Sequence, residues 1–157
     1  MTQMIEMKTT ELIGPALDWA VAHAVKAWES AHELFPTMTL DPRFSGVEPR
    51  PYPRGEFGSM LMTCVLVPNN PFRQDPQPFC PSIDWSQGGP LIDKYKVDLF
   101  PTDPVMPKAV ITPDLSEPHF YFRQFGHTPL IAAMRCLVAS KLGDTVMVPA
   151  ELVTAAQ

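Results

Sequence analysis

The side chains best suited to binding or catalysis lie close together in the middle of the chain. They are the carboxylate of Asp84, the indole of Trp85, the amide of Gln87 and the glycine pair Gly88 and Gly89. An indole stacks on a base or sugar, and the carboxylate and amide offer hydrogen-bond partners. We expect a short helix to begin at Pro90, with glycines before it that let a ligand approach its N–H groups. The stretch predicts a binding site for a small polar, nucleotide-like ligand.

The same residues have a simpler interpretation. Gly88, Gly89 and Pro90 form a sequence that is common in turns between structural elements, and a tryptophan next to such a turn often packs into the core. On this alternative, Trp85 is an anchor of the fold and the stretch binds nothing. The sequence leaves both interpretations open.

Three further residues are candidates for the same site. Thr128 is a candidate N-cap of a helix beginning at Pro129, and the start of that helix is a second place that favours an anion. Arg135 has the charge to close over a phosphate, and Trp19 has the ring to line a pocket. The predicted ligand-binding set is Asp84, Trp85, Gln87, Gly88, Gly89, Thr128, Arg135 and Trp19.

Catalysis is the weaker hypothesis. The sequence has no nucleophile elbow, no phosphate-binding Walker loop, no zinc-protease motif and no paired cysteine spacing. Cys80 near Asp84, with a histidine supplied by the fold, would make a thiol hydrolase. Asp84 with Asp93 or Asp18 would make a carboxylate pair, although the spacing does not force them together. We therefore assign no catalytic residue and expect neither a metal nor a cofactor.

A protein–protein adaptor is the other class of function that the side chains permit. Aromatic residues are frequent anchors of protein interfaces. The candidate anchor surface comprises Trp19, Phe120, Tyr121 and Phe122. It would bind a host factor without any small ligand.

Two segments have the periodicity of helices that would position these residues. An apolar stripe at helical spacing predicts a helix over 15–30. A second helix is predicted over 129–142, with Thr128 before it and Gly143 after it. Strands are predicted at 59–67, 95–100, 119–125 and 145–148. The expected fold class is α+β, with one small, mainly antiparallel sheet packed by two amphipathic helices.

The remaining segments are expected to be irregular. Prolines recur through 31–80 and predict a long loop region, with an extended, polyproline-like run at 49–55. The ends, 1–8 and 152–157, are expected to be loose. A length of 157 residues predicts a single domain.

Composition limits the partners and the compartment. The net charge of −5 and the pI of about 5.3 argue against binding duplex nucleic acid. Three widely spaced cysteines favour reduced thiols, and the chain has neither a membrane-length apolar run nor a signal-peptide pattern. We expect a cytoplasmic protein. Short strands with exposed edges also predict a homo-oligomer.

Three blocks resemble the phage NinX family, whose members have no established function. The blocks are 11–22 (ELIGPALDWAVA), 81–92 (PSIDWSQGGPLI) and 128–144 (TPLIAAMRCLVASKLGD), in family order. Ile83 stands where the family pattern has a small polar residue, and the proline-rich segment 31–80 is longer than in typical members. The resemblance implies a phage or prophage origin and work inside a bacterial host. It implies no reaction.

Overall fold

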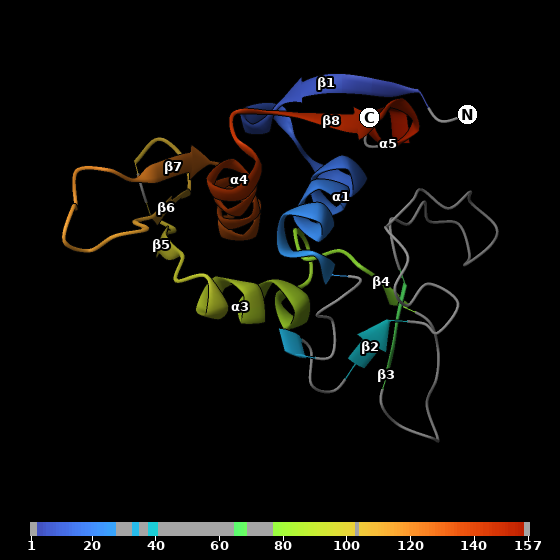
Figure 1. Cartoon of the computed structure of the whole chain (residues 1–157), viewed down its shortest axis with the longest axis horizontal. Helices are drawn as coiled ribbons and strands as arrows, with labels where there is room; N and C mark the ends of the chain where they lie inside the picture. The colour runs from blue at the N-terminus through green and yellow to red at the C-terminus, as the bar shows by residue number, and fades with distance from the viewer. Residues whose placement is uncertain are drawn as a thin grey trace.

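The structure is a computed structural model, and it describes residues 3–27, 33–34, 38–40, 65–68, 77–102 and 104–155 (Figure 1). The elements along the chain are β1 (Met4–Lys8), η1 (Thr9–Glu11), α1 (Gly14–Val25), β2 (Met38–Leu40), β3 (Val65–Pro68), β4 (Gln77–Pro78), α3 (Trp85–Lys94), β5 (Asp98–Phe100), β6 (Lys108–Ile111), β7 (Phe122–Phe125), α4 (Pro129–Leu142), β8 (Thr145–Pro149) and α5 (Ala150–Ala155). The predicted polyproline-like run and the first part of the predicted strand 59–67 lie outside the described residues.

Helix α4 is the centre of the fold, and its bounds are those predicted from the sequence. The Thr128 hydroxyl accepts a hydrogen bond from the Ile131 amide, Pro129 occupies the first turn, and Gly143 ends the helix at a φ of 97°. The helix contacts α1, α3, β5, β6, β7 and β8. The prediction of an amphipathic α4 is wrong, because surrounding elements bury nine of its residues on more than one face.

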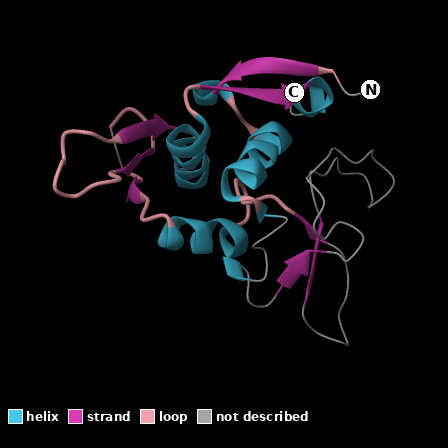
Figure 2. Cartoon of the chain, viewed as in Figure 1, coloured by secondary structure: helices cyan, strands magenta, loops and turns pink. Residues whose placement is uncertain are grey.

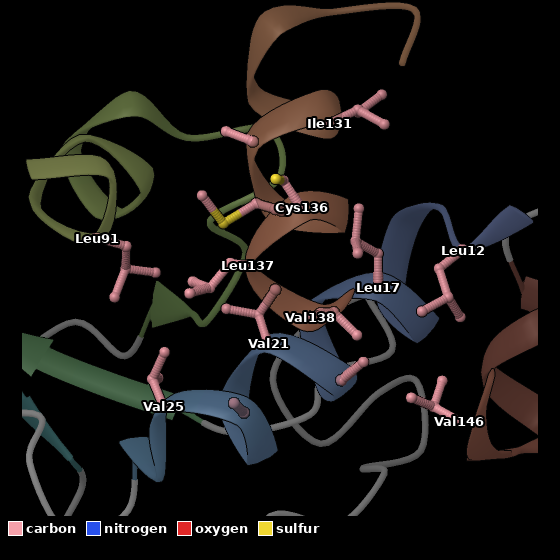
Figure 3. Packing of buried hydrophobic residues seen from close by; sticks show 14 of the residues in the cluster. Leu12, Leu17, Val21, Val25, Leu91, Ile131, Cys136, Leu137, Val138 and Val146 are labelled. Atoms are coloured by element: carbon pink, nitrogen blue, oxygen red, sulfur yellow. The ribbon is translucent and has the colours of Figure 1, made fainter. Parts of the chain in front are cut away.

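Helix α1 packs against α4 and forms the second half of the core (Figure 3). Leu17 and Val21 of α1 lie with Leu137 and Val138 of α4, and all four are fully buried. Leu91 joins this cluster from α3. Burying side chains of this size contributes about 1.5–3 kcal/mol each, so the α1–α4 contact is a main source of stability.

In the part of the chain that the structure describes, the strands form three separate antiparallel sheets, and the α+β class is confirmed (Figure 2). β1 pairs with β8, β3 lies between β2 and β4, and β6 lies between β5 and β7. The expected single sheet is therefore wrong. Helix α4 lies between the β5–β6–β7 sheet and α1, so those strands face the helix and not the β1–β8 pair.

Both ends of the chain are more ordered than expected. Residues 4–8 form β1, which pairs with β8 over its whole length. Ile5 and Met7 pack against the core from this strand. Residues 150–155 form α5, and its Leu152 is fully buried. The expectation of loose ends fails here because apolar side chains at both ends complete the same core.

Candidate functional site

Helix α3 begins five residues earlier than the sequence predicted. It starts at Trp85 and not at Pro90, with Asp84 as its N-cap. The Asp84 carboxylate accepts hydrogen bonds from the Ser86 amide at 2.9 Å and the Ser86 hydroxyl at 2.6 Å. A capping aspartate satisfies the first free N–H groups better than a proline farther along the chain. Gly88 and Gly89 consequently lie within the helix and do not precede an anion-binding helix start.

The amide of Gln87 turns inward. Its side chain is 1% exposed, and its Oε1 accepts a hydrogen bond from the Cys80 amide at 2.7 Å. The carbonyl of Cys80 in turn accepts from the amides of Ile83 and Asp84. Gln87 therefore holds the turn before α3 in place.

Asp18 reaches the same turn from α1. Its side chain is 4% exposed, and its Oδ1 accepts a hydrogen bond from the Ser82 amide at 2.9 Å. Burial raises the pKa of the Asp18 carboxyl to about 7, while the Ser82 amide and hydroxyl act to lower it. The second turn of α1 and the turn before α3 are thus joined through a buried carboxyl group.

The two glycines have different surroundings. A Cβ at Gly88 would lie 2.5 Å from Leu130 Cδ2 and 2.6 Å from the Pro81 carbonyl oxygen. Gly88 therefore permits the close approach of α3 to the start of α4. A Cβ at Gly89 would have no heavy atom within 4 Å. Of these two glycines, Gly89 is the one that faces open space.

A shallow hollow of about 320 Å³ lies beside Gly89, between α3 and β5. It is lined by Gly89, Ile92, Asp93, Lys96, Val97 and Asp98. Two carboxylates and one ammonium give the lining a net negative charge. The hollow suits a ligand with hydrogen-bonding groups more than one dominated by phosphate.

Trp85 is the predicted residue most available to a ligand. Its side chain is 54% exposed, so the alternative of a core anchor does not describe it. Trp85 and Gly89 are four residues apart in α3 and therefore share one face of the helix. The neighbouring Ile83 is 66% exposed.

Arg135 and Thr128 serve the packing of α4. Arg135 donates from Nε to the Leu12 carbonyl and from Nη1 to the Phe125 carbonyl, both at 2.8 Å. Burial lowers the pKa of this guanidinium group. The Thr128 hydroxyl is occupied as the α4 N-cap. Neither residue lines the hollow beside Gly89.

Trp19 lies in another place. Its ring lies against the His23 ring, with centroids 4.0 Å apart and the planes tilted by 35°. The two residues line a second hollow with Leu142 of α4 and residues 145–147 of β8. The eight predicted site residues are thus distributed over the α3 region, α4 and the α1–β8 region. Asp84, Trp85, Gln87, Gly88 and Gly89 lie in one region because they are neighbours in the sequence, and of the eight only Gly89 lines the hollow between α3 and β5.

The fold also places the groups considered for catalysis. Burial, reinforced by the negative charges of Asp18 and Asp84, raises the pKa of the Cys80 thiol to about 12. A thiol of that pKa is protonated at neutral pH and is a poor nucleophile. Among the described residues, no group of three histidine, cysteine or acidic side chains is arranged to hold a metal ion.

Sequence reasoning missed Ile92, Lys96 and Asp98 as lining residues. The available signal was the helical spacing from Gly89 to Ile92 and Asp93, which places all three on one side of α3. Lys96 has a φ of 55°, a left-handed conformation that reverses the chain after α3. This reversal carries Asp98 back beside the helix, and local spacing does not reveal it.

Comparison with known families gives one clear result. The sequence profile described as Bacteriophage P22, NinX matches residues 8–141. The chain therefore belongs to this phage NinX family, as the three sequence blocks had indicated. A search of curated proteins found no match. Within the described residues, no helix is long and apolar enough to cross a membrane.

Proposed function

We propose that this NinX-family protein binds a small polar ligand in the hollow beside Gly89, without catalysing a reaction. The observation that carries the proposal is the open space at Gly89, on the same helical face as the exposed ring of Trp85. The ring would stack on a planar or sugar-like part of the ligand. Asp93, Lys96 and Asp98 would supply its hydrogen-bond partners.

The charge of the hollow refines the kind of ligand. Two carboxylates lie in the lining against one lysine, so the base and sugar of a nucleotide-like ligand fit better than its phosphates. Nucleosides are expected to bind at least as tightly as the corresponding nucleotides. The proposed role is sequestration of a small host molecule inside the infected bacterial cell.

The experiment is a calorimetric titration with matched panels of nucleosides, nucleotides and simple sugars. Stacking of one base on an aromatic ring contributes about 1–3 kcal/mol, so Trp85→Ala should weaken binding about tenfold or more. Gly89→Ala should also weaken binding, because its methyl group enters the hollow without contacting the protein. Tyr121→Ala is the matched control, since Tyr121 is an exposed aromatic residue in the β6–β7 connection. If the wild type binds no member of the panels below millimolar concentration, the proposal is wrong.

A second candidate function is supported by a different observation. Ile83 and Trp85 present two large exposed apolar side chains, one on the turn before α3 and one at the first residue of α3, and the side chains of Gln87 and Asp18 accept hydrogen bonds from that turn. Such a pair fits an adaptor that anchors a host protein. Phe120 and Tyr121 are also exposed, whereas Trp19 and Phe122 of the predicted anchor surface are half-buried.

The two candidates predict different mutant behaviour. A protein partner seated on the apolar pair should be lost with Ile83→Asp and retained with Gly89→Ala. Binding of a small ligand in the hollow should be weakened by Gly89→Ala and retained with Ile83→Asp. Binding of a purified host partner to these two variants, measured by biolayer interferometry, distinguishes the candidates.

A further inference from the structure

The β1–β8 pair leaves one edge of β8 without a partner strand among the described residues. Hydrogen bonds at the two ends of the pair show which residues face which edge. The Thr9 amide donates to the Asp144 carbonyl, and the Ala150 amide donates to the Gln3 carbonyl, both at 2.8 Å. The pairs Thr9–Asp144 and Gln3–Ala150 continue the register of the β1–β8 ladder at its two ends.

In an antiparallel ladder, hydrogen-bonded residue pairs alternate with pairs whose amides and carbonyls point outward. Because the end pairs bond across the ladder, Val146 and Val148 also face β1. Thr145 and Met147 therefore direct their N–H and C=O groups toward the free edge. Pro149 follows on that edge without an N–H group, which limits the row of donors to these two residues.

A hollow of about 310 Å³ lies along this free edge. It is lined by Trp19, His23, Leu142, Thr145, Val146 and Met147. Successive side chains of a strand point to opposite faces, so a hollow that touches three consecutive residues lies at the strand edge and not over one face. No residue of β1 lines it, which places it on the unpaired side of β8.

The hollow has the chemistry of a side-chain pocket. Its walls are the adjacent rings of Trp19 and His23 with the apolar side chains of Leu142, Val146 and Met147. No aspartate, glutamate, lysine or arginine is in the lining. The space accepts an apolar side chain, and the adjacent backbone groups accept an extended main chain.

We infer that the free edge of β8 binds an extended peptide segment of a partner protein as a third strand. The segment would exchange backbone hydrogen bonds with Thr145 and Met147 and place one apolar side chain between Trp19 and Leu142. Strand addition of this kind obtains affinity from the main chain and specificity from a pocket for alternate side chains. This surface is separate from the hollow beside Gly89.

A second copy of this chain fits the edge less well. Two copies joined through β8 would carry their α1 helices on the same side of the joined sheet, because α1 contacts β8 on the face that buries Val146 and Val148. Trp19 and His23 already line the space at the edge on that side. A single peptide strand brings no helix layer with it.

The probe is a panel of capped heptapeptides, Lys-Val-Thr-X-Thr-Val-Lys, with Phe, Leu, Met or Ala at the centre. Directly opposed residues of paired strands point to the same face, so the threonines would lie opposite Thr145 and Met147. N-methylation of both threonine amides should abolish binding, whereas N-methylation of both valine amides should not. Binding should also follow the size of the central side chain and be lost with Ala.

The protein variants test the same edge. Met147→Pro removes a donor that β1 does not use, and the extended Val146 tolerates a following proline, so binding should weaken at least tenfold with little change in the melting temperature. Glu6→Pro is the matched control, since Glu6 lies opposite Met147 but on the outer edge of β1. Leu142→Ala should weaken binding through the pocket without touching the strand.

Amide hydrogen exchange measured by NMR gives a direct readout. In the free protein, Thr145 and Met147 should exchange faster than Val146 and Val148, and a bound peptide should slow them at least tenfold. Absence of binding by the whole panel at millimolar concentration overturns the inference, as does equal binding to Met147→Pro. A dimer in sedimentation that protects Thr145 and Met147 without peptide assigns the edge to a second copy instead.

Discussion

The polar side chains in and around the central stretch act mainly as hydrogen-bond acceptors for backbone amides. Asp18, Asp84 and Gln87 each accept a hydrogen bond from an amide of the turn or of the first turn of α3. An unpaired buried amide costs about 1–3 kcal/mol, so these contacts explain why the stretch is chemically dense. What remains free for a ligand is the ring of Trp85 and the space at Gly89.

The neighbouring glycines should respond in opposite ways to the same substitution. Gly88→Ala should destabilise the protein by about 1–3 kcal/mol, because its methyl group would meet the Pro81 carbonyl and Leu130. Gly89→Ala should stabilise it by about 0.5–1 kcal/mol, because the helix gains an alanine and nothing is in the way. Urea denaturation of the two variants measures the difference. Equal effects would show that α3 does not approach α4 as closely as described.

Asp18 should make stability fall as the pH rises. Its pKa is about 7 in the folded protein, raised by burial, against about 3.9 for an unfolded aspartate. Between these two pH values the folded state holds a proton that the unfolded state has released. The contribution of this proton to the free energy of unfolding is therefore complete below about pH 4 and declines to nothing as the pH rises through about 7. The shift corresponds to at most about 4 kcal/mol.

Asp18→Asn isolates this effect. The carboxamide oxygen can still accept from the Ser82 amide but cannot ionise. The free energy of unfolding of the variant, measured by urea titration from pH 4 to pH 8, should lack the decline attributed to Asp18. If wild type and variant have the same pH profile, the Asp18 carboxyl ionises as freely in the folded state as in the unfolded chain.

At the scale of the elements, α3 depends on its cap. It is a ten-residue helix with two glycines and a proline, and Pro90 has no N–H to donate to the Ser86 carbonyl. Glycine and proline lower helix propensity, so the Asp84 cap and the packing of Leu91 must offset that cost. The Asp84 cap is therefore expected to contribute to the stability of α3.

Asp84→Ala should destabilise the protein by about 1 kcal/mol, the typical cost of a lost N-cap. Asp84→Ser should restore most of this stability, because a serine hydroxyl also accepts from the helix amides. Thermal unfolding of the three proteins provides the measurement. Full stability of the alanine variant would mean that the carboxylate is free to act on a ligand.

At the scale of the whole molecule, Arg135 joins three parts of the fold. From α4, its guanidinium group donates hydrogen bonds to the carbonyl of Leu12, before α1, and to the carbonyl of Phe125, at the end of β7. These residues are far apart in sequence and lie on different sides of α4. One side chain thus fixes the position of both neighbours relative to the central helix.

Arg135→Met should destabilise the protein by about 1–3 kcal/mol, because two carbonyl groups lose their donors. Arg135→Lys should recover only part of this loss, since an ammonium group lacks the planar fork that reaches two separate acceptors. Chemical denaturation gives the free energies of unfolding. A lysine variant as stable as the wild type would show that only one of the two hydrogen bonds matters.

The sequence by itself determined the elements whose limits depend on near neighbours. The bounds of α4 follow from Thr128, Pro129 and Gly143, all within the helix or next to it, and the start of α1 follows from Gly14 and Pro15. Their hydrogen bonds involve residues within a few positions, so the pattern is visible in the printed chain. The α+β class follows from these elements and the short strands between them.

Only the tertiary structure decided how distant segments use their side chains. β1 pairs with β8 across nearly the whole chain, which made an ordered strand of an expected loose end. The described strands divide into three sheets, and α4 packs between the β5–β6–β7 sheet and α1. The inward turn of Gln87 and the hydrogen bond that Asp18 accepts from the Ser82 amide depend on where α1 and α3 come to lie. Burial and long-range pairing are properties of the assembled fold, and spacing along the sequence does not specify them.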